Sequence, residues 1–146
     1  MFASSNAAYE ALSEPMKQFL GGLKARHDGS PNYNRRARID GKAGDKVYPS
    51  ADHPVIRTHP VTGKKGIYVN PVFTQYICDV PEDESNAILE FLYAHNRKEQ
   101  FICRFSWEKD SVAFWDNRAV QHLAMWDYFP QVRSGFRVTV AGDKPY

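Results

Sequence analysis

The residues with the greatest chemical potential lie in the last third of the chain, where one histidine precedes two arginines. His122 is followed by Arg133 and Arg137, at offsets of eleven and fifteen residues. The run from Arg133 to Val140 alternates and contains β-branched residues, which predicts a strand. Side chains four residues apart on a strand share a face, so the two guanidiniums are expected to point the same way, about 13 Å apart. The pattern indicates a metal ion flanked by two anions, because arginine binds carboxylates or sulfonates with a planar fork and keeps its charge.

Each of these residues also has a simpler interpretation. A lone histidine on a strand is more often a packed or surface residue than a ligand, and rim arginines often pair with a carboxylate such as Asp127 or with water. A three-ligand non-haem iron site needs two histidines and one carboxylate, with open positions for co-substrate and oxygen. The first two ligands usually have the form His-x-Asp or His-x-Glu, and the sequence contains neither.

Length and composition limit the class of protein. A chain of 146 residues is expected to form a single domain with a real core. The formal net charge of +2 is too small to indicate a nucleic-acid or membrane-surface partner. The first residues lack the basic and apolar regions of a signal peptide, and no apolar run is long enough to span a bilayer. We therefore expect a cytoplasmic protein with no nucleic-acid or membrane partner.

The elements that must position these side chains are mostly short strands. Helices are predicted over residues 6–20, with an interruption at 13–15, and over 84–96, where apolar residues form one helical stripe. Strands are predicted over residues 23–27, 55–59, 66–70, 101–107, 111–115, 119–124 and 136–141. Short strands without βαβ alternation indicate a mainly β fold with flanking helices, of the jelly-roll (double-stranded β-helix) type.

Residues 28–53 are polar and show no periodicity. They are rich in glycine, proline, asparagine and charged residues. A long segment of this kind inside one domain is usually functional or disordered, so we expect a lid or a flexible loop.

The sequence resembles the C-terminal part of the taurine dioxygenase family, which are Fe(II)- and 2-oxoglutarate-dependent oxygenases. The similarity covers nearly the whole chain and is most specific in its last third. The similar segments are His53–Gly63, Tyr68–Thr74, Trp115–Arg118 with His122, Asp127-Tyr128, Pro130, Arg133 and Arg137, and Gly142–Pro145.

The resemblance implies a role for four residues. His122 would be the distal iron ligand, Arg133 would pair with the far carboxylate of 2-oxoglutarate, and Arg137 would hold the anionic head of the substrate. Phe73 would form a wall of the substrate pocket. The implied reaction uses O2 to hydroxylate a sulfonate such as taurine, or a sulfate ester. It releases sulfite or sulfate together with succinate and CO2.

The sequence departs from the family pattern at its N-terminus. In the family the His-x-Asp pair precedes text similar to Met1–Ser4. The resemblance therefore implies a partial dioxygenase domain over residues 1–146, a jelly roll incomplete at its N-terminus and inactive alone. Two other readings stay open: a non-catalytic jelly-roll module that has lost the metal site, and a homo-oligomer in which a partner chain supplies the missing ligands.

Overall fold

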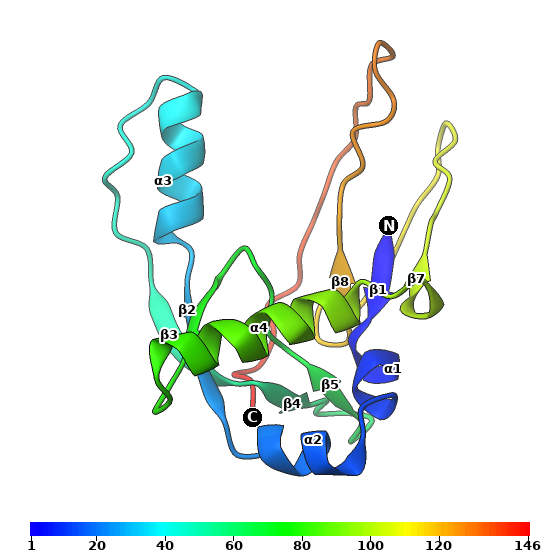
Figure 1. The fold of residues 1–146 in the computed structure, drawn as a ribbon. Coiled ribbons are helices and arrows are strands. Elements are labelled where there is room, and N and C mark those ends of the chain that lie inside the picture. The colour runs from blue at the N-terminus through cyan, green and yellow to red at the C-terminus, as the bar shows by residue number, and fades with distance from the viewer.

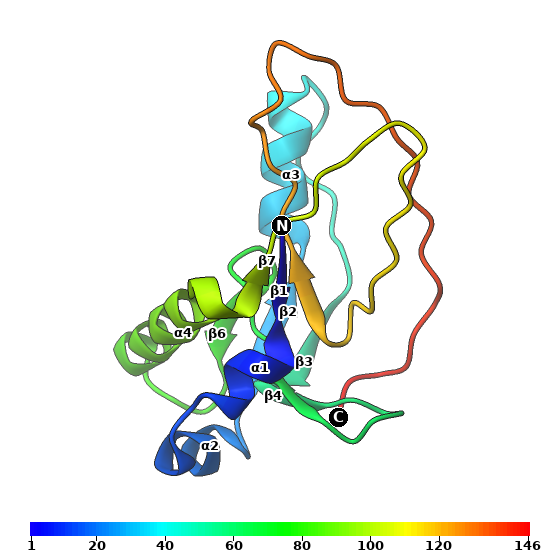
Figure 2. The ribbon, with the colours of Figure 1, turned by 90° about the vertical axis from the view of Figure 1, so that its right-hand side faces the viewer.

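The computed structural model describes residues 1–146, and its strands form three small antiparallel sheets with four α-helices around them (Figures 1 and 2). The helices are α1 (Ser5–Glu10), α2 (Glu14–Leu20), α3 (Ser30–Ile39) and α4 (Glu82–Asn96). The strands are β1 (Phe2–Ser4), β2 (Lys24–Asp28), β3 (Ser50–Pro54), β4 (Ile56–Thr58), β5 (Lys65–Ile67), β6 (Thr74–Ile77), β7 (Ile102–Cys103) and β8 (Val120–His122).

One sheet joins the beginning of the chain to its last third. Strand β1 lies between β7 and β8, and Phe2 is paired with both Cys103 and His122. The pairing continues beyond the strand, because the Leu123 amide donates to the Met1 carbonyl at 3.0 Å. This sheet therefore fixes the backbone on both sides of His122.

The other two sheets form the middle of the molecule. Strand β2 lies between β3 and β6, and β4 pairs with β5 as a hairpin. The hairpin confirms the strands predicted around the turn at residues 60–63. Gly63 in that turn has a φ of 69°, a conformation that glycine adopts without the steric cost of a side chain.

The two amphipathic segments form helices as predicted. Ser13 caps α2 by accepting a hydrogen bond from the Met16 amide at 3.4 Å, and Pro15 lies in the first turn. This cap accounts for the predicted interruption between α1 and α2. Helix α4 begins with three acidic residues and has His95 in its last turn, an arrangement that complements the helix dipole.

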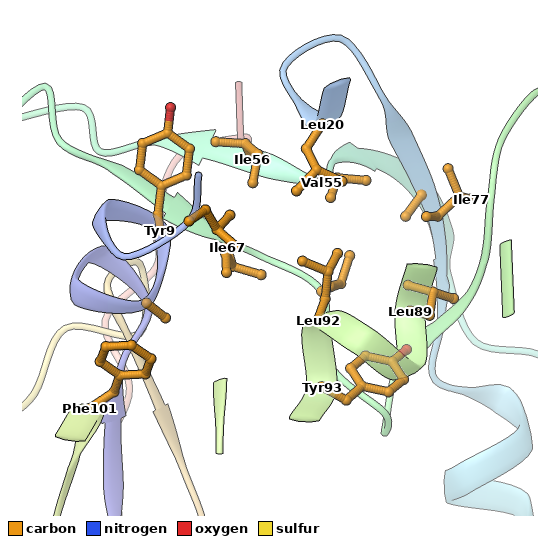
Figure 3. Close-up of a cluster of buried hydrophobic side chains, with 14 residues drawn as sticks. Tyr9, Leu20, Val55, Ile56, Ile67, Ile77, Leu89, Leu92, Tyr93 and Phe101 are labelled. Carbon is orange, nitrogen blue, oxygen red and sulfur yellow. The ribbon is translucent and has the colours of Figure 1, made fainter. Parts of the chain in front are cut away.

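A single hydrophobic core lies where α4 crosses the strands (Figure 3). Leu89 and Leu92 of α4 are buried together with Ile67 of β5, Ile77 of β6 and Leu20 of α2. The remaining core residues are Ala8, Tyr9, Leu12, Ala25, Val55, Ile56, Val69, Tyr93 and Phe101. Burying a leucine or isoleucine side chain contributes about 1.5–3 kcal/mol, so this cluster is the main source of stability. None of its members lies beyond residue 101.

The segment expected to be a lid or a flexible loop contains a helix. Residues 30–39 form α3. At its first residue the Ser30 amide donates a hydrogen bond to the Asp28 side chain at 2.7 Å. No residue of α3 is buried, and the helix projects from the body of the molecule in Figure 1. Its role as a lid stays a prediction.

Two predicted strands do not form. Residues 111–115 and 136–141 belong to no strand, and β7 is shorter than the predicted strand at 101–107. The side chains of Phe114 and Phe136 are 97% and 104% exposed. A strand requires hydrogen bonds to a neighbouring strand, and no strand of this chain lies beside these residues. The shared strand face predicted for the two arginines is therefore wrong for this structure.

No helix of the chain combines the length and the hydropathy needed to cross a bilayer.

Candidate functional site

The site predicted from the sequence is centred on His122 at the end of β8. The His122 ring packs against the Trp115 ring with their centroids 5.1 Å apart, and Trp115 packs in turn on Phe2 of β1 at the same distance. The rings cover part of the exposed His122, and this partial burial lowers its pKa; the nearby Arg137 guanidinium and N-terminal amine lower it further. A neutral imidazole has the lone pair that a metal ligand needs.

The structure brings Arg137 into the same group. Its guanidinium carbon lies 5.8 Å from the centre of the Trp115 ring, so Trp115 is contacted by both Arg137 and His122. This cation–π contact holds the charge beside the imidazole even though residues 136–141 form no strand. The grouping joins two of the residues that the sequence singled out.

The other two predicted site residues lie elsewhere. Arg133 donates to the Met125 carbonyl at 3.5 Å, and its guanidinium carbon lies 4.9 Å from the centre of the Tyr128 ring. Phe73 packs against Tyr33 of α3, with the ring centroids 5.9 Å apart. Neither Arg133 nor Phe73 contacts the group around His122, so the four predicted residues do not form one pocket in this structure.

A polar network missed by the sequence analysis holds the segment before β8. The His59 ring, 7% exposed, lies after the β4 strand with its Nε2 atom 2.9 Å from Asp116 Oδ2. Its Nδ1 atom accepts hydrogen bonds from the amides of Val61 and Thr62 at 3.2 and 3.1 Å. Since Nδ1 accepts two donors, the ring proton is on Nε2, and the ring donates to Asp116. Residue spacing could not indicate this pairing, because His59 and Asp116 lie 57 positions apart in the sequence.

Asp116 connects this histidine to the turn that leads into β8. Its carboxylate accepts from the Arg118 guanidinium at 2.7, 2.9 and 3.1 Å and from the Arg118 amide at 2.8 Å. The Asp116 carbonyl accepts from the amides of Ala119 and Val120. The Arg118 guanidinium, and to a lesser extent His59, hold the pKa of the Asp116 carboxyl well below its usual range. The network therefore fixes where β8 begins.

Replacing Asp116 by asparagine is expected to destabilise the chain by about 1–2 kcal/mol, because charge-assisted hydrogen bonds to Arg118 and His59 are lost. The expected loss of stability is this small because the Asp116 side chain is 36% exposed, so solvent partly screens its interactions. Chemical denaturation measures the change, and hydrogen exchange should show faster exchange at the β8 amides. The matched control is Asp127→Asn, which breaks the exposed ion pair with Arg104 and should change stability by less than about 0.5 kcal/mol. Equal effects would mean that Asp116 does not position β8.

A second histidine cluster lies on the middle sheet, away from β8. His27 of β2 stacks on Tyr68 with ring centroids 5.5 Å apart, and His53 packs edge-on against both rings. Burial, and then the neighbouring His53, lower the pKa of His27 to about 4. His27 is therefore a neutral, packed residue at physiological pH.

This cluster predicts a pH dependence of stability. The unfolded His27 has an ordinary pKa near 6.5 and the folded one a pKa of about 4, so the unfolded chain binds more protons between these values. Stability should therefore fall as the pH drops from about 6.5 to 4, by roughly 1–2 kcal/mol after allowance for partial exposure. Urea denaturation of the wild type and of His27→Gln across this range measures it. A wild-type curve parallel to that of the variant would contradict the assignment.

The residues present do not form a metal site by themselves. No group of three or more His, Cys, Asp and Glu side chains in the chain is arranged to hold a metal ion. His122 offers one imidazole, whereas the iron site expected from the sequence needs two histidines and a carboxylate. Iron therefore does not fit the 146 residues alone.

Comparisons with known proteins agree on one family. The model for "Taurine catabolism dioxygenase TauD, TfdA family" matches residues 1–139. A Schizosaccharomyces pombe protein described as a candidate alpha-ketoglutarate-dependent sulfonate dioxygenase is 42% identical, over 100% of this chain and 37% of its own length. The alpha-ketoglutarate-dependent sulfonate dioxygenase of Saccharomyces cerevisiae is 34% identical, over 99% of this chain and 35% of its own length.

The three-dimensional comparison gives the same result. The crystal structure of a taurine dioxygenase from Burkholderia xenovorans matches with a TM-score of 0.69 and 39% sequence identity. The match covers 82% of this chain and 38% of that protein. The chain thus spans little more than a third of the length of these three relatives.

Proposed function

The chain belongs to the taurine catabolism dioxygenase TauD, TfdA family, and we propose that it carries the substrate-anchoring part of an Fe(II)- and 2-oxoglutarate-dependent dioxygenase. The proposed substrate is an anionic sulfonate such as taurine, or a sulfate ester. The products would be sulfite or sulfate, succinate and CO2. We further infer that the antiparallel sheets are parts of a jelly roll.

The observation that carries this proposal is the contact of His122 and Arg137 with the same ring, Trp115. An imidazole that can bind a metal and a cation that can bind a sulfonate lie on one aromatic side chain. The imidazole centroid is 5.1 Å and the guanidinium carbon 5.8 Å from the centre of the Trp115 ring. A dioxygenase needs its metal and the carbon next to the substrate's anionic group close together, because the anion anchors the bond that reacts. The grouping suits that requirement.

Each predicted residue has one role in this proposal. His122 contributes one ligand to iron, which when bound would activate oxygen together with 2-oxoglutarate. Arg133 pairs with the far carboxylate of 2-oxoglutarate, and Arg137 with the sulfonate or sulfate. Phe73 forms a wall of the substrate pocket. Arg133 and Phe73 must approach His122 for these roles, so the proposal requires the segments that carry them to adopt another position in the active assembly.

A segment transplant tests the proposal. Residues 1–146 replace the matching third of the Saccharomyces cerevisiae sulfonate dioxygenase, which aligns with 99% of this chain at 34% identity. The hybrid is expected to consume 2-oxoglutarate only in the presence of a sulfonate or sulfate ester, with release of sulfite or sulfate. A folded hybrid that binds neither Fe(II) nor 2-oxoglutarate would favour the alternative of a non-catalytic jelly-roll module.

A further inference from the structure

Arg57, in the middle of β4, is a buried cation with no anionic partner. The residue is 5% exposed, its Nε atom has no hydrogen-bond acceptor, and no carboxylate forms an ion pair with it. Its guanidinium lies over the face of Tyr68, whose ring centre is 5.1 Å from the guanidinium carbon. A cation–π contact stabilises a guanidinium by less free energy than its removal from water costs, so this contact alone does not compensate for the burial of the charge.

His53 presents a second unpaired group beside it. The Nδ1 atom of His53 is buried without a partner, and its ring lies edge-on to the same Tyr68 ring, with centroids 5.7 Å apart. His53 in β3 and Arg57 in β4 lie on either side of the bend at Val55, and both side chains contact the Tyr68 ring. Two unsatisfied nitrogen groups therefore converge on one aromatic side chain.

The C-terminal residues add a third cation. The Thr58 amide donates to the Tyr146 carbonyl at 2.7 Å, and Figures 1 and 2 both place the C-terminus near β4. This pairing brings the exposed Lys144 toward the cluster. Burial lowers the pKa of His53, and the charges of Arg57 and then Lys144 lower it further, which is consistent with their proximity. The Lys144 residue itself is exposed to solvent.

The acidic groups nearby are already engaged. Asp52 opposes the effect of the cations on His53, but its carboxylate is bound to Arg26 with Nε and Oδ1 2.7 Å apart. The Asp143 carboxylate, next to Lys144, attracts the Arg118 guanidinium, whose pKa is raised by Asp116 and, to a lesser extent, by Asp143. The cluster thus combines a buried guanidinium, an imidazole and an ammonium group, and no side-chain carboxylate forms an ion pair with Arg57.

We propose that Arg57, His53 and Lys144 form a binding site for a small oxyanion, such as a sulfate or a carboxylate. The oxyanion would accept hydrogen bonds from the Arg57 guanidinium and from the protonated Nδ1 of His53, while Lys144 closes the exposed side. The site is separate from His122, Arg133 and Arg137, so its test does not depend on the dioxygenase proposal.

Thermal unfolding with sodium sulfate, at an ionic strength held constant with sodium chloride, is the first test. Sulfate at about a hundred times its Kd should raise the Tm of the wild type by roughly 5–10 °C in a saturable way. Arg57→Met should lose this saturable increase, and in sulfate-free buffer its Tm should equal or exceed that of the wild type, because the unpaired charge is gone. The matched control is Arg36→Met on the exposed face of α3, which should keep the full increase.

Two further measurements separate an oxyanion from a trapped water. Titration with sulfate should shift the Arg57 Nε–H signal in an NMR spectrum of the wild-type chain, with the same Kd as the thermal effect. If Arg57→Met does not fold, His53→Gln and Lys144→Met decide the question, and both are expected to reduce the sulfate increase. Equal increases in the wild type and these variants, with no shift of the Arg57 signal, would mean that water alone satisfies the cluster and would overturn the proposal.

Discussion

Replacing His122 by alanine in the hybrid with the Saccharomyces cerevisiae relative is expected to abolish sulfonate-dependent consumption of 2-oxoglutarate. Loss of an outer-shell partner of a metal ligand typically costs about 10–100-fold in affinity or activity, and loss of a ligand itself should cost more. The expected decrease in turnover is therefore more than about a hundredfold. Turnover and the iron content of the purified hybrid are the two measurements, and both should fall together.

A control variant in the same sheet distinguishes metal binding from packing. Cys103 is exposed and pairs through the backbone with Phe2, the residue that also pairs with His122. Cys103→Ser should keep both iron and turnover. If His122→Ala retains iron at the level of Cys103→Ser, the histidine is a packing residue on Trp115 and the proposed ligand role is wrong.

The two arginines are expected to respond differently in the same hybrid. Arg137→Ala should raise the KM for the sulfonate by about ten- to a hundredfold, with a much smaller effect on the KM for 2-oxoglutarate. Arg133→Ala should do the reverse. The reason is that each guanidinium would make a charge-assisted, bidentate contact with a different anion, and alanine leaves that anion without its partner. Steady-state kinetics with each substrate varied in turn gives both constants.

Lysine variants at the same positions provide the matched comparison. Lysine keeps the charge but not the planar fork, so Arg137→Lys and Arg133→Lys should each recover part of the lost affinity for the same substrate. Equal changes in both KM values for either alanine variant would mean that the two roles are assigned wrongly. If the variants change the turnover number but neither KM, the arginines do not bind either anion.

The local elements were predictable because their signals are local. The hairpin of β4 and β5 follows from two apolar runs around a turn, and α4 follows from one helical stripe after an acidic first turn. The interruption before α2 follows from the serine cap at Ser13 and the proline two residues later, at Pro15. Helix α3 was missed because it buries none of its residues, so its sequence contains no apolar periodicity to detect.

The strands predicted at 111–115 and 136–141 show the limit of this reasoning. Alternation says which residues favour a strand, but a strand exists only where a second strand satisfies its backbone hydrogen bonds. That partner is a long-range property of the fold. The shared face predicted for Arg133 and Arg137 depended on such a strand and failed with it, whereas the approach of Arg137 to His122 through Trp115 did not require one.

By itself, the sequence determined the family and the residue types that bear on its chemistry: one histidine able to bind a metal and two arginines able to bind anions. Only the tertiary structure decided which of them meet. It placed His122 beside Trp115 and Arg137, paired His59 with Asp116 across 57 positions of sequence, and left Arg57 buried without an anion. The reason is that hydrogen-bond partners and burial depend on segments far apart in the chain, and residue spacing contains no information on which segments come together.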